Sequence, residues 1–215
     1  MTHPLWPLFD LRLRTERLEL RLPDDADLAR LCAIARAGIH DPGEMPFSIP
    51  WTDKPSPRFE REFAQFHWGI RAQWQPDAWS LELMVVANGE PIGVQGILAR
   101  DFATYGLVGT GSWLGRAFQG KGYGKEMRGA VLALAFEGLH AKVAVTEAFA
   151  DNRASAGVSR ALGYHENGIG RAAPRGQPID TLRFRMTADD WRSRPRPRVE
   201  LEGLAASLEL FGVAG

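Results

Sequence analysis

Hydrophobic and polar residues alternate along several stretches of the chain, and a period of two residues predicts β-strands. In residues 11–22, leucines alternate with arginines and glutamates around a break at Thr15 and Glu16, which indicates an interrupted, half-exposed strand. Residues 79–87 and 91–98 carry similar runs on either side of Asn88-Gly89, the strongest hairpin signal in the sequence. Further strands are predicted at residues 108–114, 142–149, 164–168 and 181–186.

Other stretches place hydrophobic residues three and four positions apart, which is the spacing of an amphipathic helix. Residues 38–57, in contrast, are irregular, rich in proline, and hold Phe47 and Trp51. A loop of this length inside a compact domain is usually functional, so we interpret it as a wall over an active site. Packing of its aromatic residues explains them equally well. The predicted helices span residues 26–37, 58–74, 126–139 and 153–162.

The order of the predicted elements is a strand, two helices, three antiparallel strands, and then helices alternating with strands. A run of strands followed by such alternation is typical of the α+β class. The length of 215 residues suits one large domain, which we expect to span residues 1–191. Residues 192–215 are an Arg- and Pro-rich tail that ends in alternating apolar residues. We expect this tail to pack on the domain or on a partner subunit.

The composition excludes several classes of protein. Lys+Arg and Asp+Glu balance at 26 each, so no overall charge attracts nucleic acid or an anionic membrane. The apolar share of 45% indicates a sizeable core, and no apolar run approaches the length of a membrane span. Cys32 is the single cysteine, which excludes a disulfide framework or a multi-cysteine metal site. Together with the absence of a signal-peptide pattern, it favours a reducing cytoplasm.

Residues 119–125, Gln-Gly-Lys-Gly-Tyr-Gly-Lys, lie between a predicted strand and a predicted helix. Glycines let the backbone turn tightly and bring successive N–H groups close to a ligand. The first N–H groups of a helix have no partner inside the helix, and the helix dipole adds a partial positive charge there. With Lys121 and Lys125 as further cations, this loop is predicted to bind a phosphate or pyrophosphate.

The spacing of the glycines distinguishes between phosphate-binding motifs. The sequence has no Gly-x-x-x-x-Gly-Lys-Ser/Thr loop, and its strictly alternating glycines do not fit Gly-x-Gly-x-x-Gly. A nucleotide-binding loop is further disfavoured because no Mg²⁺-binding Ser or Thr follows the lysine. The arrangement of Gln119, Gly122 and Gly124 instead resembles the Gln/Arg-x-x-Gly-x-Gly/Ala pyrophosphate loop of the GNAT superfamily of acyl-CoA-dependent N-acyltransferases.

A second motif, one helix and one strand further along, strengthens this resemblance. Residues 151–164 contain Asn-x-x-Ser and Leu-Gly-Tyr, and they are similar to an element of the RimJ/RimL-type branch of the superfamily. Residues 40–51 are similar to an actinobacterial subgroup of that branch associated with succinyl-CoA. The resemblance covers about residues 11–191. It implies the GNAT fold, a mixed, mostly antiparallel central sheet with a splayed V between its fourth and fifth strands and helices on both sides.

The resemblance also implies how a CoA thioester is bound. In the family, a free backbone N–H of the splayed strand meets the thioester carbonyl, and here that group belongs to Trp113 or Leu114. Many relatives use a helix tyrosine as the acid for the thiolate, but Ser159 stands at that position. The branch places Ser155 near the sulfur, where it acts as a hydrogen-bond donor, or it is simply a residue of the first helical turn. The cofactor-binding residues implied are Gln119, Gly120, Lys121, Gly122, Tyr123, Gly124, Lys125, Asn152, which also suits a helix cap, and Ser155.

No motif identifies the general base. Glu147, in the strand that leads to Asn152, is our first candidate, and Glu82, Asp101 and His40 are others. Each is also explained as a surface charge or a loop cap, and a chain of water molecules is an alternative to any single base. Transfer of a succinyl group would in addition require a cation for the terminal carboxylate, and the sequence does not select one.

These observations predict a cytoplasmic enzyme that moves an acetyl or succinyl group from acetyl-CoA or succinyl-CoA to a small-molecule or protein amine. We expect no metal, nucleic acid or membrane partner. A non-catalytic CoA-binding or sensing protein is the alternative, favoured by the absent helix tyrosine and opposed by the intact loop. The apolar alternation after Arg198 suits extension of a sheet or pairing with a second subunit, and we expect a homo-oligomer.

Overall fold

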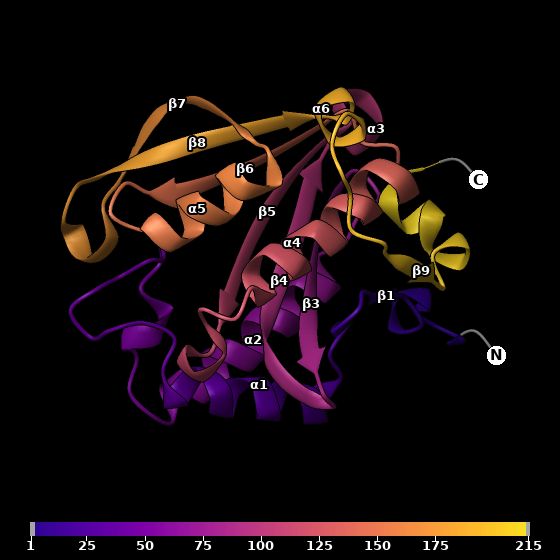
Figure 1. The fold of residues 1–215 in the computed structure, drawn as a ribbon. Helices are drawn as coiled ribbons and strands as arrows, with labels where there is room; N and C mark the ends of the chain where they lie inside the picture. The colour runs from indigo at the N-terminus through magenta and orange to yellow at the C-terminus, as the bar shows by residue number, and fades with distance from the viewer. Residues whose placement is uncertain (1–2, 214–215) are drawn as a thin grey trace.

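A computed structural model describes residues 3–213, which form one nine-stranded sheet with helices on both faces (Figure 1). The strands lie in the order β7-β8-β6-β5-β4-β3-β2-β1-β9. They span Arg12–Arg14 (β1), Leu18–Arg21 (β2), Ala78–Ala87 (β3), Glu90–Arg100 (β4), Leu107–Leu114 (β5), Val143–Phe149 (β6), His165–Ala172 (β7), Ile179–Thr187 (β8) and Glu200–Glu202 (β9). The helices span Asp25–Ala37 (α1), Arg58–Ala72 (α2), Phe102–Tyr105 (α3), Tyr123–Ala133 (α4), Arg153–Leu162 (α5) and Ala188–Arg192 (α6). The predicted α+β class is confirmed.

The sheet is mostly antiparallel, and β5 with β6 is the parallel pair within it. These two strands pair over Leu107–Gly109 and Val143–Val145 and then diverge. Beyond the divergence, β5 continues to pair with β4 as far as Leu114, while β6 pairs with β8. The predicted V-shaped opening is therefore present. The family's fourth and fifth strands are β5 and β6 in this numbering, and the later residues of these two strands are the arms of the V.

Different helices cover the two faces of this V (Figure 1). The helix α4 is buried over most of its length, and its apolar residues join the larger core under the sheet. The helices α1 and α2 form a second core on the opposite face, where Phe59 and Phe63 pack with Met84 and Val94. Because strand side chains alternate between faces, each residue of the V is assigned to one of these two layers.

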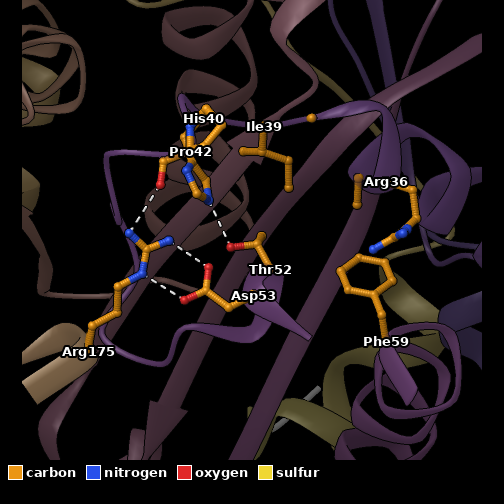
Figure 2. Close-up of a pocket in the computed structure, with 10 residues that line it drawn as sticks. Arg36, Ile39, His40, Pro42, Thr52, Asp53, Phe59 and Arg175 are labelled. Carbon is orange, nitrogen blue, oxygen red and sulfur yellow. Dashed lines mark hydrogen bonds and ion pairs between the residues drawn. The ribbon is translucent and has the colours of Figure 1, made fainter. Parts of the chain in front are cut away.

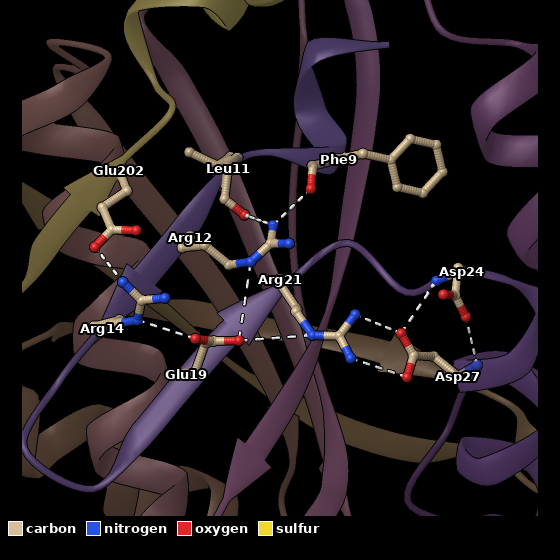
Figure 3. A network of polar contacts seen from close by, with 9 residues as sticks. All are labelled: Phe9, Leu11, Arg12, Arg14, Glu19, Arg21, Asp24, Asp27 and Glu202. Carbon is tan, nitrogen blue, oxygen red and sulfur yellow. Dashed lines mark hydrogen bonds and ion pairs between the residues drawn. The ribbon is translucent and has the colours of Figure 1, made fainter. Parts of the chain in front are cut away.

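Residues 11–22 form two strands rather than one interrupted strand. The break at Thr15 is a tight turn in which its N–H donates to the Leu18 carbonyl (2.9 Å), so β1 and β2 make a hairpin. A charged network links this hairpin to its neighbours (Figure 3): Arg14 contacts Glu19 and Glu202, and Arg21 forms a two-point ion pair with Asp27 of α1. The apolar positions change from odd numbers (Leu11, Leu13) to even numbers (Leu18, Leu20) across the turn, and this change of phase lets both strands face the same core.

The tail contributes to the same sheet and core. The strand β9 pairs with β1 and extends the edge of the sheet. Phe211 is fully buried, where it packs against Trp74 and Trp79, and the Trp74 Nε1–H donates to the Leu210 carbonyl (2.7 Å). Deletion of residues 200–213 would therefore expose a large aromatic cluster.

Candidate functional site

The glycine loop leads directly into α4, which begins at Tyr123, three residues before the predicted start. Gly120 and Gly122 have φ angles of 74° and 82°, a left-handed conformation that favours glycine. In the described part of the chain no side chain caps the first turn of α4, so its N–H groups remain available to an anion. Lys121 and Lys125 are exposed beside them. This geometry suits the predicted pyrophosphate site.

Arg17 also contacts the glycine loop, and the sequence analysis did not identify it. Its Nη1–H donates to the Lys121 carbonyl (3.1 Å), and its guanidinium lies 4.8 Å from the centre of the Tyr123 ring. It also pairs with Glu126, which would otherwise place an unpaired carboxylate in the first turn of α4. Arg17 thus removes a charge that opposes anion binding. It lies more than a hundred positions away in the sequence, and only the fold brings it here.

Gln119 serves as an anchor of the loop. Its Nε2–H₂ donates to the carbonyls of Leu114 (2.8 Å) and Ile39 (2.7 Å). It thereby ties the end of β5 to the start of the irregular segment 38–57. The Arg116 N–H adds a bond to the Gly38 carbonyl (3.0 Å) in the same place. The side chain of the predicted phosphate-binding glutamine is therefore occupied in holding three segments together.

The backbone of β5 supplies N–H groups to the V. The Gly115 N–H donates to the Ile92 carbonyl of β4 (3.0 Å), and in an antiparallel ladder alternate residues bond to the same neighbour. Trp113 therefore directs its N–H and carbonyl to β4, whereas Ser112 and Leu114 direct theirs to the V. The Leu114 carbonyl indeed accepts its bond from the side of the loop, through Gln119. Of the two predicted oxyanion positions, Leu114 faces the V, and Ser112 faces it as well.

The side chain of Trp113 lies on the α1/α2 face of the sheet. Its ring is 6.0 Å from Trp51 and 6.4 Å from Phe63, centre to centre. Trp51 belongs to the segment 38–57, so this segment does form an aromatic wall beside the V, and its aromatic residues also pack in the second core. Packing of the aromatic residues is thus confirmed, and the role of the segment as a wall over an active site stays a prediction.

Asn152 and Ser155 lie at the start of α5. The Ser155 N–H donates to Asn152 Oδ1 (3.0 Å), so Asn152 is the N-cap of the helix. Within residues 3–213 the Ser155 hydroxyl has no hydrogen-bond partner, which leaves it free for a ligand. The helix α5 lies beside α4, the helix that follows the glycine loop. A Cβ added at Gly124 of α4 would lie 3.5 Å from Val158 of α5.

Two carboxylates lie on the α1/α2 face of the sheet, on opposite sides of the V. Glu82 of β3 is aligned with Gly96 of β4, which is aligned with Gly111 of β5. The first glycine makes room for the carboxylate, since a Cβ at Gly96 would lie 2.5 Å from Glu82 Oε1. The second leaves open space, because a Cβ at Gly111 would meet nothing within 4 Å. These two glycines leave space between the Glu82 carboxylate and β5.

The two carboxylates differ in environment. Glu82 is partly buried and accepts a hydrogen bond from Ser80 (3.3 Å). Burial away from water raises the pKa of Glu82 to about 7. Glu147 of β6 is exposed and already forms an ion pair with Arg183 of β8 (2.9 Å). A carboxyl group with a pKa near neutrality is suited to take up and release protons, which favours Glu82 as the base.

The other two base candidates lie elsewhere. Asp101 follows the end of β4 that is remote from the open V. His40 lines a pocket of about 210 Å³ at the edge of the segment 38–57, where its Nε2 is 2.8 Å from Thr52 Oγ1 (Figure 2). Arg175, from the loop between β7 and β8, closes this pocket through a two-point ion pair with Asp53. The pocket therefore lies where two loops meet.

Metal-binding clusters and membrane-spanning helices were both looked for in the described residues. Residues 3–213 include no cluster of His, Cys, Asp and Glu side chains that would hold a metal ion. No helix in the same part of the chain is long and apolar enough to cross a membrane.

Comparison with known proteins identifies this arrangement. The family model of the acetyltransferase (GNAT) domain matches residues 17–165. RimJ of Mycobacterium smegmatis, solved in complex with CoA-disulfide, is 18% identical with a TM-score of 0.72, over 94% of this chain and 95% of that chain. An acetyltransferase of Salmonella typhimurium that modifies the N-terminal serine of ribosomal protein L7/L12 is 18% identical, with a TM-score of 0.68 over 80% and 96%. RimL, the ribosomal L7/L12 alpha-N-protein acetyltransferase, solved with CoA, is 19% identical, with a TM-score of 0.66 over 82% and 97%.

Proposed function

Because the chain belongs to the GNAT acetyltransferase family, we propose that it transfers an acyl group from a CoA thioester to a primary amine. The observation that carries the proposal is the conjunction of the open V with the uncapped glycine loop at its edge. The N–H groups of the loop and first turn, with Lys121 and Lys125, suit the pyrophosphate of CoA. Asn152 and Ser155 suit the pantetheine arm on the neighbouring helix.

The reaction requires three tasks of this chain. The attacking amine must lose a proton, and Glu82 accepts it, directly or through water, because its pKa lies near neutrality. The thioester carbonyl gains negative charge as the C–N bond forms, and the N–H groups of Ser112 and Leu114, which face the V, suit its stabilisation. The C–S bond then breaks, and the Ser155 hydroxyl donates a hydrogen bond to the departing thiolate.

The amine acceptor is proposed to be a protein N-terminus. RimL and the Salmonella protein act on the terminal amine of a ribosomal protein, and they have the same fold. Glu82 offers a carboxyl group to a protonated amine on the α1/α2 face, whereas Glu147 is already paired with Arg183. The single cysteine, Cys32, is buried and unpaired, in keeping with action in a reducing cytoplasm. A small-molecule amine and a homo-oligomeric state remain predictions.

The test measures free CoA thiol after mixing the protein with acetyl-CoA and short peptides with free N-termini. We expect thiol release only when a peptide is present, and none from N-terminally blocked peptides without lysine. Tight binding of CoA without any thiol release across an acceptor panel would support the alternative, a CoA-binding or sensing protein. Failure to bind CoA or its thioesters by calorimetry would contradict the proposal altogether.

A further inference from the structure

Arg128 is a buried cation held by neutral groups. It lies in the middle of α4 and is only 4% exposed. Within residues 3–213 it donates to two side-chain hydroxyls, and no carboxylate forms an ion pair with it. Removing a guanidinium from water is costly unless an opposite charge compensates, and an apolar side chain of similar length would fill the same space without that cost. The residue therefore points to a role other than support of the core.

The guanidinium joins the two arms of the V just beyond the point where they separate. The strands β5 and β6 pair as far as Gly109 and Val145. Further along β5, the Ser112 hydroxyl accepts a hydrogen bond from Nη2–H, and on β6 the Thr146 hydroxyl accepts one from Nη1–H, each at 3.2 Å. The Arg128 side chain thus spans the gap between the arms, and we expect it to limit how far they move apart or together.

Thr146 adds a second link between the same two arms. Its hydroxyl donates to the Thr110 carbonyl of β5 (3.0 Å) while its oxygen accepts from Arg128. A hydroxyl has one donor hydrogen and two acceptor lone pairs, so both bonds hold at once. Arg128, Thr146 and the backbone of β5 therefore form one connected set of polar contacts at the base of the V.

Ser112 connects this bridge to the proposed reaction. Its N–H faces the V, where it suits the thioester oxyanion, and its hydroxyl contacts Arg128 on the α4 face. An oxyanion is stabilised well only by donors that are in place before the reaction, and a displacement of about 1 Å can lower the rate on the order of 10²-fold. We propose that Arg128 is a positioning residue, which aims the Ser112 N–H at the thioester carbonyl by bridging β5 to β6; this inference rests on the proposed function.

Substitution separates positioning from support of the fold. Arg128→Met removes the bridge and keeps an unbranched side chain in the core. We expect kcat for thiol release to fall roughly 10- to 100-fold, while the dissociation constant for CoA, measured by calorimetry, stays within about threefold because the glycine loop is unchanged. Arg160→Met, at an exposed arginine of α5 paired with Glu166, is the matched control and should keep both values. Loss of CoA affinity by the same factor as the rate would show a purely structural role and overturn the inference.

A double-mutant cycle tests whether Arg128 acts through Ser112. Ser112→Ala removes the hydroxyl and keeps the N–H, so it should also lower kcat. Because both substitutions break the same bridge, the double variant should be no more than about threefold slower than Arg128→Met alone. Losses that simply multiply would overturn the inference. If Arg128→Met fails to fold by circular dichroism, Ser112→Ala and Thr146→Val break the bridge at its two ends, and the same criterion applies to that pair.

The infrared stretch of the thioester carbonyl in bound acetyl-CoA gives a readout without turnover. Hydrogen bonds to a carbonyl oxygen lower its stretching frequency, so we expect a higher frequency in Arg128→Met than in the wild-type protein. The same frequency in both proteins would overturn the positioning role and leave the proposed function standing. Absence of thiol release by the wild-type protein with every acceptor would overturn both.

Discussion

The two faces of the V differ in their charged side chains. The face covered by α1 and α2 presents the carboxylates of Glu82 and Glu147, and the face covered by α4 presents Arg128, with Lys121 and Lys125 at its edge. A single layer of backbone separates them, and the N–H groups of β5 lie in that layer. The sheet thereby keeps the proposed base, Glu82, apart from the cations that bind an anionic CoA thioester. Within residues 3–213, the acceptor side has the unpaired carboxyl group of Glu82, and the donor side has the cations.

Removal of the acid on the acceptor side should have the largest effect. Glu82→Gln keeps the shape of the side chain and removes the proton acceptor, so kcat should fall roughly 10²- to 10⁴-fold at neutral pH. The rate is measured as thiol release from a saturating CoA thioester. Glu147→Gln is the matched control on the other side of the V, and we expect a change below about threefold. A larger loss in Glu147→Gln than in Glu82→Gln would assign the base to Glu147 instead.

The same substitution should change how stability depends on pH. The pKa of Glu82 is raised from 4.5 to about 7 in the folded state, so between these values the folded protein binds more protons than the unfolded chain. The contribution of Glu82 is therefore complete below pH 4.5 and is lost as the pH rises through 7. Relative to Glu82→Gln, the wild-type free energy of unfolding should fall by about 2–3 kcal/mol over that interval.

Urea denaturation of both proteins at several pH values measures this difference. His67 is also buried, and its pKa is lowered to about 4, so its contribution to stability is lost as the pH falls from 6.5 toward 4. Both proteins share His67, and the difference between them isolates Glu82. Parallel stability curves for the two proteins would show that Glu82 is not shifted by burial.

On the donor side, the loop lysines should act on affinity. Lys121→Gln with Lys125→Gln removes two exposed charges beside the first turn of α4, and we expect about a tenfold increase in KM for the CoA thioester with kcat nearly unchanged. The increase should shrink at high salt, because exposed charges are screened. A matched change at Lys142, which is exposed and remote from the loop, should leave KM unchanged. An equal effect from Lys142→Gln would contradict a specific role for the loop.

The smallest effect on stability is expected for the contact between the segment 38–57 and the loop that joins β7 to β8. Arg175→Gln removes the exposed ion pair with Asp53, and such pairs contribute about 0–1 kcal/mol to stability. We expect a change in the free energy of unfolding within that range and faster proteolysis of residues 38–57. Limited proteolysis with mass spectrometry measures the second effect. An unchanged cleavage rate would show that the ion pair does not fasten the segment.

Much of the fold could be predicted from the sequence because it follows from local patterns. The Asn88-Gly89 turn fixes the register of β3 with β4, and the motifs around Gly122 and Asn152 indicate the GNAT family, which the family model confirms. The V was predicted from the resemblance and is present. The hairpin in residues 11–22 was missed, because such short strands depend on their partners in the sheet. The apolar alternation after Arg198 had suggested that the tail extends a sheet, and β9 does pair with β1.

The site was predicted less completely, for a physical reason. Among the candidates for the general base, the sequence ranked Glu82 below Glu147. The pKa of Glu82 is raised by burial, and that burial depends on the strand register that places Gly96 beside it. Arg128 was one of the many arginines in the chain, and its burial without an ion pair to a carboxylate of residues 3–213 is visible only once α4 packs on the V. Charged residues are easy to list from a sequence, but their environments come from tertiary packing.

The most direct test of the account is the pH dependence of kcat/KM in the wild-type protein and in Glu82→Gln. We predict that the wild-type value rises with pH through a pKa of about 7 and then levels off, since deprotonated Glu82 accepts the proton of the amine. Glu82→Gln should lack this step and remain slow across the range. The same step in both proteins would contradict the central claim that the acidic face of the V deprotonates the acceptor through Glu82.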